Sequence, residues 1–344
     1  VNEKAAMEVA AAAAYSGARA MVTMKQVGLN VAADPLMSLA YVGVKGGMVI
    51  VSADDPGPIS SQTEQDTRRF ADFCRIPVFD PSSPEEAYKM IGEAFEYSEK
   101  YNTPVLFRPT TRVCHAYASI DNCDSPSPKK YEGFVKDSKK WVIFPRLSFA
   151  NHIMIEKRNV EIGKDFSTYS ANKAEGGNSE KAVVTSGISY AYTKECLKDY
   201  PDVKLIKIAT AYPFPEDFVL SSLDGAKEVL CIEELSPFIE EQILKLAGKH
   251  GLQLKVSGKL DGKVQAGGEN STDKIAAILG EFLGKDFTAE GYDLSDAPAL
   301  PVRPPVLCAG CPHRASFYAV KQAMKGRKAY FCGDIGCYTL GNAM

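Results

Sequence analysis

Short apolar strands that alternate with helices, in two separate series, constrain the fold of this chain more than any other feature of its sequence. In the first series, buried strands are expected at residues 20–24, 47–53 and 104–108, and helices at residues 3–16 and 32–41. Two further helices are expected to start near residues 62 and 83, because Ser61 and Ser82 each stand three residues before a glutamate in the capping-box pattern. This alternation predicts a mostly parallel sheet covered by helices.

A second series of the same kind begins at residue 181. Its expected strands are residues 181–185, 203–208, 228–232 and 252–256, and its expected helices are residues 188–197 and 237–250. Between the two series the alternation is lost, and polar, turn-rich stretches at residues 124–130 and 173–179 indicate a connection with one helix around residues 150–158.

These patterns divide the chain into parts of different character. We expect a first α/β domain at residues 1–122, a connecting segment at 123–180, a second compact α/β domain at 181–295 and the start of a third domain at 305–344. Proline-rich residues 296–305 link the last two. Because the chain opens on Val1 directly into a helix and stops just after a glycine-rich turn, we expect it to be a segment of a longer protein, incomplete at both ends.

Composition excludes several classes of protein. Hydrophobic residues make up 45% of the 344 residues, enough for a packed core. A formal net charge of -3 argues against a nucleic-acid binder, which normally carries a basic excess. No apolar run approaches the ~18–20 residues that cross a bilayer. The alanine-rich start follows Glu3 and Glu8 and is typical of a helix rather than a signal peptide. We therefore expect a cytoplasmic protein without nucleic-acid or membrane partners.

Four of the nine cysteines lie within the last forty residues. Cys308 and Cys311 form a CxxC pair, and Cys332 and Cys337 follow. Two thiolates at CxxC spacing can hold one metal ion or cluster. The same pattern also fits a zinc site with a second ligand pair, a dithiol redox pair at a helix start, or ordinary buried cysteines, and the spacing alone leaves these alternatives open.

Polar residues near the start of the first domain form a second candidate site. Lys25, Gly28 and Asn30 lie in a strand-to-helix turn, and open α/β sheets bind ligands at the carboxyl ends of their strands. An ordinary connection has the same pattern. Glu3 lies in the first turn of a helix, where an acidic side chain complements the helix dipole and is usually solvated.

A third candidate site follows the expected strand at residues 47–53. Ser61, Gln62 and Arg68 lie at the start of an expected helix, whose free amides can bind a carboxylate or phosphate. Arg108 and Arg112 flank the end of the strand at residues 104–108 and could hold an anion. A solvated, capped helix and a surface arginine are the alternative interpretations.

Four stretches of the sequence resemble a known family. NEKAAMEVAAAAAYSGARAMVTMKQVGLNVAADPL, VIVSADDPGPISSQTEQDTR, and CAGCPHR with GDIGCYTLG resemble the alpha subunits of indolepyruvate:ferredoxin oxidoreductases, a branch of the thiamine-diphosphate-dependent 2-oxoacid:ferredoxin oxidoreductases. The match spans both ends of the chain in the expected order. It implies α/β thiamine-diphosphate-binding domains with parallel sheets covered by helices, plus a transketolase C-terminal-like α/β domain in the middle, where only the general pattern matches.

The resemblance also implies a function. Such enzymes oxidatively decarboxylate an aryl 2-oxo acid of the indolepyruvate type to its acyl-CoA and pass electrons through iron–sulfur clusters to ferredoxin. A smaller beta subunit completes a hetero-oligomer, and the cofactors are thiamine diphosphate, Mg²⁺ and 4Fe–4S clusters, with coenzyme A as co-substrate. Two alternatives remain: a related enzyme for pyruvate or a branched-chain 2-oxo acid, and a non-catalytic iron–sulfur electron-transfer protein.

Roles for individual residues follow from the same resemblance. Glu3 matches the catalytic glutamate that contacts the pyrimidine ring of the cofactor, and we place Lys25, Gly28 and Asn30 beside it in the cofactor site. Ser61, Gln62, Arg68 and Arg112 are assigned to the substrate. Cys308, Cys311 and Cys337 resemble cluster ligands, whereas Cys332 does not. The diphosphate would bind through Mg²⁺ in the third domain, of which only the start is present, so this segment alone is expected to be inactive.

Overall fold

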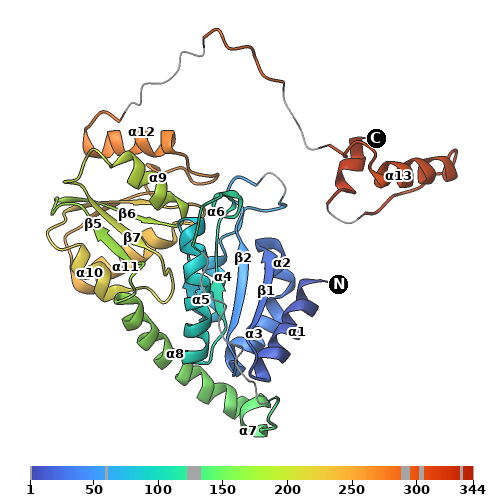
Figure 1. Ribbon diagram of the computed structural model, residues 1–344, viewed down its shortest axis with the longest axis horizontal. Coiled ribbons are helices and arrows are strands. Elements are labelled where there is room, and N and C mark those ends of the chain that lie inside the picture. The colour runs from blue at the N-terminus through green and yellow to red at the C-terminus, as the bar shows by residue number, and fades with distance from the viewer. Residues whose placement is uncertain are drawn as a thin grey trace. The chain divides into compact units, whose positions relative to one another are not determined.

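The computed structural model describes residues 2–58, 61–121, 133–287, 295–301, 306–333 and 336–343. They fall into two compact units, Val1–Thr288 and Ala289–Met344. The first unit contains two sheets with their helices, and the second contains one long helix and a short 3₁₀ turn (Figure 1). No helix in the described part of the chain is both long and apolar enough to cross a membrane.

The first sheet has four parallel strands in the order β1-β2-β4-β3. Its strands are β1 (Ala20–Lys25), β2 (Met48–Ala53), β3 (Val78–Phe79) and β4 (Val105–Phe107). Its helices are α1 (Glu3–Tyr15), α2 (Gln26–Val31), α3 (Ala33–Val42), α4 (Thr67–Cys74), α5 (Pro84–Tyr101) and α6 (Thr111–His115). β2 begins with three fully buried apolar residues, which is typical of a parallel strand covered on both faces. The expected α/β fold of this part is confirmed.

The second sheet has five strands in the order β5-β7-β6-β8-β9. The strands are β5 (Lys173–Glu175), β6 (Lys181–Ser186), β7 (Lys204–Ile208), β8 (Glu228–Ile232) and β9 (Lys255–Ser257), and the helices are α9 (Ile188–Cys196), α10 (Glu216–Ser222), α11 (Phe238–His250) and α12 (Thr272–Leu283). All neighbouring strands are parallel except β5, which pairs antiparallel with β7. β5 lies within residues 173–179, which were expected to be a turn-rich connection without a strand. That expectation was wrong, because the segment pairs with β7 at the sheet edge.

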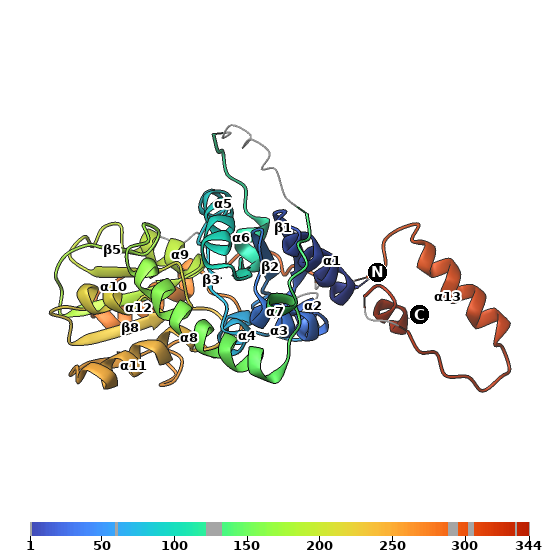
Figure 2. The same cartoon turned by 90° about the horizontal axis from the view of Figure 1, so that it is seen from below.

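The connection between the sheets is more helical than its sequence indicates. α7 (Ser138–Trp141) precedes α8 (Pro145–Ser167), a helix of 23 residues. In both views α8 runs from α10, beside the second sheet, to α3, beside the first (Figure 1, Figure 2). Near its end the ring of Phe166 meets that of Phe79 edge-on, with centroids 5.4 Å apart. The turn expected at residues 124–130 lies outside the described residues.

The two sheets share an apolar core. One cluster of buried side chains contains Ile50 of β2, Ile206 of β7 and Phe238 of α11. Residues of both α/β series therefore pack against each other inside the unit Val1–Thr288.

Two helix starts differ in detail from the capping-box prediction. α4 begins at Thr67 rather than near residue 62, because the Asp66 side chain caps it by accepting a hydrogen bond from the Arg68 amide at 3.0 Å. α5 begins one residue later than expected, with Ser83 at its N-cap and the Glu86 carboxylate accepting from the Ser82 amide at 2.7 Å.

The second unit contains α13 (Pro312–Ala323) and the 3₁₀ turn η1 (Thr339–Ala343). α13 begins directly after Cys311, as expected for a CxxC pair at a helix start. The rings of His313 and Tyr338 meet edge-on, with centroids 5.0 Å apart.

Candidate functional site

Glu3 and Gly28 form the centre of the candidate cofactor site. Asn2 caps α1 by accepting a hydrogen bond from the Ala5 amide at 3.0 Å, so Glu3 is the first residue of the helix. Its partly exposed side chain lies against Gly28 of α2. A Cβ atom built on Gly28 would lie 2.7 Å from Glu3 Cγ and 2.9 Å from Glu3 Oε1. Only glycine at this position leaves the carboxyl group of Glu3 where it is.

The rest of α2 binds the loop that follows β2. Buried Gln26 donates from Nε2 to the Thr63 carbonyl at 3.0 Å, and Asn30 donates from Nδ2 to Gln65 Oε1 at 2.9 Å. The Oε1 atom of Gln26 is buried without a hydrogen-bond partner within the described part of the chain. Lys25, at the carboxyl end of β1, is exposed. Glu3 of α1 thus contacts Gly28 of α2, and Asn30 lies on the same short helix as Gly28.

The loop between β2 and α4 holds two of the predicted substrate residues. Ser61 donates to Asp55 Oδ2 at 2.6 Å, and Asp55 also accepts from Thr111 Oγ1 at 2.8 Å. The neighbouring Gln62 is exposed. The hydroxyl of Ser61 therefore stabilises the loop, whereas Gln62 projects toward solvent.

Arg68 does not lie where a substrate residue should. Its side chain is 0% exposed, and it donates to both carboxylate oxygens of Asp66, at 2.9 and 2.6 Å, and to Glu233 Oε2 at 2.8 Å. The assignment of Arg68 to substrate needs correction, because its guanidinium is enclosed by the Asp66 carboxylate and by Glu233 and two backbone carbonyls of the second α/β series. The capping-box pattern predicted that Arg68 lies at an exposed helix start, but the ion pair with Asp66 holds its side chain inside the protein.

Arg108 is the second arginine of the same buried cluster. It donates from Nε to Asp54 Oδ2 at 2.7 Å and from Nη1 to Asp80 Oδ2 at 3.2 Å. Its Nη2 atom has no hydrogen-bond partner within the described residues but lies 4.0 Å from Asp66 Oδ1. Asp54, Asp80 and Arg108 directly follow β2, β3 and β4, and Glu233 follows β8. The carboxyl ends of strands from both sheets therefore meet at this cluster. The sequence indicated Arg108 only as a possible anion binder at a strand end, and its buried partners Asp54 and Asp80 were not predicted. The signal for them was a charged residue directly after each apolar strand.

The cluster holds more carboxyl groups than arginines, and their pKa values diverge. Burial raises the pKa of Asp54 to about 6, and the pull of Arg108 offsets only part of this effect. Burial would also raise the pKa of Asp66, but Arg68 and Arg108 hold it down to about 2. Burial raises the pKa of Glu233 against the attraction of Arg68. As the pH falls, Asp54 therefore gains a proton before Asp66 does.

Arg112 joins the two α/β series at the surface. It donates from Nε to Glu269 Oε2 at 2.6 Å, and the two side chains are 50% and 32% exposed. Nearby, the Gly268 amide donates to Glu64 Oε1 at 2.6 Å. The guanidinium predicted to hold a substrate anion therefore has an internal carboxylate partner, in an exposed contact that a ligand can compete for.

The structure does not gather the predicted cluster ligands of the second unit. Cys308 and Cys337 are exposed, and Cys311 Sγ lies 3.2 Å from His313 Nδ1. Nowhere in the described ranges do three or more His, Cys, Asp or Glu side chains lie close enough together to hold a metal ion.

Comparison with known proteins shows which class of protein this chain resembles. Residues 1–168 match the family described as pyruvate flavodoxin/ferredoxin oxidoreductase, thiamine diP-bdg. A solved 2-oxoglutarate:ferredoxin oxidoreductase from Magnetococcus marinus, with 2-oxoglutarate, coenzyme A and succinyl-CoA bound, has the same fold with a TM-score of 0.59. The alignment covers 81% of this chain and 56% of that one at 14% identity, and therefore supports the fold alone.

Curated relatives narrow the class further. Over 99% of its length the chain is similar to indolepyruvate oxidoreductase subunit IorA of Methanothermobacter thermautotrophicus (41% identity), Thermococcus kodakarensis (41%) and Pyrococcus horikoshii (38%). The resemblance to indolepyruvate oxidoreductases is thereby confirmed. The chain spans 56%, 54% and 54% of these three relatives, about half of their length.

Proposed function

We propose that this chain is part of the catalytic subunit of a 2-oxoacid:ferredoxin oxidoreductase that acts on an aryl 2-oxo acid of the indolepyruvate type. The main observation in support is that the carboxyl group of Glu3 contacts Gly28, within residues that match the thiamine-diphosphate-binding family. The printed names of its relatives support the choice of substrate. The complete enzyme would also contain a smaller beta subunit and deliver electrons to ferredoxin in the cytoplasm.

The residues around α2 fit the pyrimidine ring of thiamine diphosphate. Glu3 offers a carboxylate, Gly28 offers a surface without a side chain, and the buried Oε1 atom of Gln26 is an acceptor without a partner. A flat ring with an amino group and basic nitrogens suits these three features. When bound, thiamine diphosphate supplies a carbon centre that holds the electron pair released as the 2-oxo acid loses CO₂.

The role of Glu3 is then to share a proton with a ring nitrogen. A carboxylate held at a helix start against a bare backbone has little freedom to turn away, so the proton stays at a fixed position. Lys25 and Asn30 are both exposed and would lie at the rim of the same site. Asn30 keeps the loop after β2 in place through Gln65.

Substrate contacts fall to the loops around this site. We assign Gln62, which is exposed, and Arg112, which can exchange Glu269 for the carboxylate of a 2-oxo acid, to the substrate, with Ser61 as the residue that shapes the loop. Coenzyme A would take up the acyl product. Arg68 is excluded because it is buried.

The metal centres are a separate part of the proposal. Cys308 and Cys311, at the start of α13, offer two thiolates for a 4Fe–4S cluster, and Cys337 would be a third. The described residues do not assemble these three or any comparable set of acids for Mg²⁺, so no step of the mechanism is assigned to either metal.

Thiamine-dependent viologen reduction by the complete enzyme tests the proposal. With indolepyruvate as substrate, Glu3→Gln should lower the rate by about 10²–10⁴-fold, the usual cost of losing a positioned acid–base group. Glu8→Gln, an exposed glutamate on the same helix, should leave the rate unchanged. A Glu3→Gln rate within a few-fold of wild type would remove Glu3 from the mechanism. Preference for pyruvate or a branched-chain acid, or iron without any turnover, would overturn the substrate or the enzyme assignment.

A further inference from the structure

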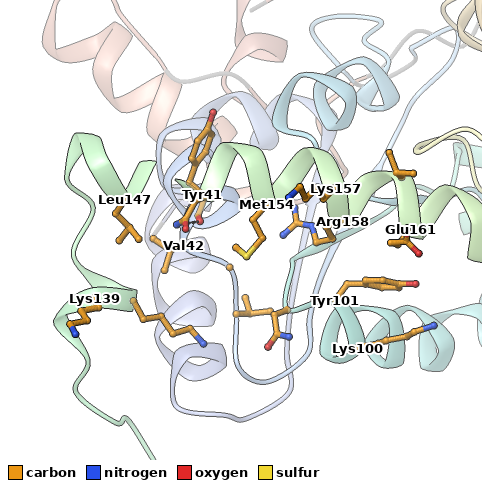
Figure 3. Close-up of a pocket in the computed structure, with 16 residues that line it drawn as sticks. Tyr41, Val42, Lys100, Tyr101, Lys139, Leu147, Met154, Lys157, Arg158 and Glu161 are labelled. Carbon is orange, nitrogen blue, oxygen red and sulfur yellow. Dashed lines mark hydrogen bonds between the residues drawn. The ribbon is translucent and has the colours of Figure 1, made fainter. Parts of the chain in front are cut away.

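A groove of about 920 Å³ opens on the opposite edge of the first sheet from the candidate cofactor site. It lies between α8 and the two segments that lead into the amino ends of β2 and β4, Tyr41–Val44 and Lys100–Asn102 (Figure 3). The volume is in the usual range for small-molecule sites. Glu3 and Gly28 lie at the carboxyl edge, so the groove is a distinct place on the protein.

The floor of the groove is built from tightly packed backbone. Val44 donates its amide to the Asn102 carbonyl at 3.1 Å. Gly43 has φ +74°, and a Cβ atom there would lie 2.5 Å from that same carbonyl oxygen. Because the two loops are held this closely, the groove is preformed rather than opened by a ligand.

The walls combine apolar surface with an excess of positive charge. Apolar and aromatic side chains are contributed by Tyr41, Val42, Leu147 and Met154. The charged lining consists of five cations, Lys100, Lys139, Lys140, Lys157 and Arg158, and one acid, Glu161. The chain as a whole carries a net charge of -3, so this concentration of cations runs against the overall balance.

Most of this charge is not neutralised by the protein. Lys100 pairs with Asp165, and Glu161 accepts from Lys164 at 3.0 Å. Within the described ranges, Lys139, Lys157 and Arg158 form no ion pair. Charges that face a groove without internal partners are available to an anionic ligand.

Arg158 is the strongest sign of a binding function. Its Nε atom is buried without a hydrogen-bond partner, and its only hydrogen bond within the described residues runs from Nη2 to the Arg75 carbonyl at 3.5 Å. Burial lowers the pKa of Arg158 to about 10, which still leaves it charged at neutral pH. Figure 3 shows the side chains of Met154 and Arg158 extending from α8 into the groove. A partly buried guanidinium without a counter-ion is unfavourable until an anion reaches it.

We propose that this groove binds a nucleotide, with its phosphate groups on Lys157 and Arg158 and its base or apolar portion against the Tyr41 and Met154 side. Neither inorganic phosphate nor an uncharged nucleoside fills both parts of the site. The inference does not depend on the proposed catalytic function.

Calorimetric titration of the full chain with three probes tests the site. ADP should bind with a micromolar Kd at low salt, and adenosine and inorganic phosphate should each bind at least about tenfold more weakly, since tenfold is what one charge-assisted contact contributes. Lys157→Gln and Arg158→Gln should each weaken ADP binding about tenfold. Lys198→Gln, which removes an exposed lysine of the second α/β series, should not.

Each outcome decides for or against the groove. Lys157 is exposed, so its replacement keeps the test valid even if Arg158→Gln loosens the fold. ADP affinity that is absent at millimolar concentration, unchanged in both variants, or matched by adenosine would overturn the proposal.

Discussion

Replacing Arg68 with glutamine should destabilise this protein more than the same replacement of Arg69, its neighbour on α4. Arg68 holds Asp66 and Glu233, two carboxylates that are each 1% exposed. Removing one partner of a buried ion pair leaves the other charge without compensation and typically costs about 3–5 kcal/mol of the free energy of unfolding. Glutamine keeps a polar side chain but can neutralise neither carboxylate.

The remaining contacts of the two carboxylates set the magnitude within that range. Asp66 still accepts from the Ser236 amide at 3.0 Å, and Glu233 still accepts from the Ile239 and Glu240 amides at 3.0 Å each. These amides offset part of the loss, so we expect a cost near the lower limit, about 3 kcal/mol. For a chain of 344 residues that corresponds to a fall of roughly 4–5 °C in Tm.

Thermal unfolding followed by circular dichroism at pH 7 measures this difference, with Arg69→Gln as the matched control. Arg69 pairs with Glu241, and the two side chains are 38% and 40% exposed. A solvent-exposed pair of this kind contributes about 0–1 kcal/mol, so Arg69→Gln should shift Tm by no more than about 1–2 °C. Equal shifts for the two variants would refute the reasoning that burial makes the Arg68 contacts costly to lose.

Three further predictions concern the candidate site, the charge cluster and the cysteines. Gly28→Ala should push the Glu3 carboxyl group aside and lower thiamine-dependent turnover by at least about tenfold, with an unchanged circular dichroism spectrum; normal turnover would mean that the Glu3–Gly28 contact is irrelevant to activity. Asp54 has a pKa of about 6 when folded and about 3.9 when unfolded, so the folded state binds the extra proton and stability falls as the pH rises from 4 to 6. Tm measured across that window should fall less steeply in Asp54→Asn, and parallel curves would contradict this. Replacing Cys308, Cys311 and Cys337 together with serine in the complete, anaerobically purified protein should remove one cluster's worth of iron and acid-labile sulfide, whereas Cys332→Ser should not; an unchanged iron content in the triple variant counts against these ligands.

Much of the fold could be predicted because strong local patterns specify it. The apolar run Met48–Ile50 is too short for a helix and has few alternatives to a buried strand, and the structure places it in β2. The site around Glu3 followed from a family resemblance rather than from chemistry, since a first-turn glutamate by itself has an ordinary interpretation. The contact with Gly28 supplies the physical reason, and it joins residues from two different helices.

What could not be predicted depends on contacts between distant parts of the chain. Arg68 and Arg112 were both assigned to the substrate from the sequence, yet one side chain is 0% exposed and the other 50% exposed. The difference arises because Glu233, 165 residues away from Arg68, follows a strand of the other sheet. The full length of α8 was missed for a related reason. Only Ile155, Asn159, Ile162 and Phe166 are buried on this helix. Its other apolar residues are largely exposed and obscure the helical spacing of these four in the sequence.

The loop between β2 and α4 lies between the candidate cofactor site and the second sheet and contacts both through hydrogen bonds. Asp54 and Asp66 bracket this loop, and both depend on the arginines of the buried cluster. Thr63 and Gln65, inside the loop, accept hydrogen bonds from α2, which also carries Gly28. Because Arg68 is neutralised by Glu233 as well as by Asp66, the geometry of the loop requires the second sheet to be in place. Hydrogen bonds therefore connect α2, which carries Gly28, to the second sheet through the loop between β2 and α4.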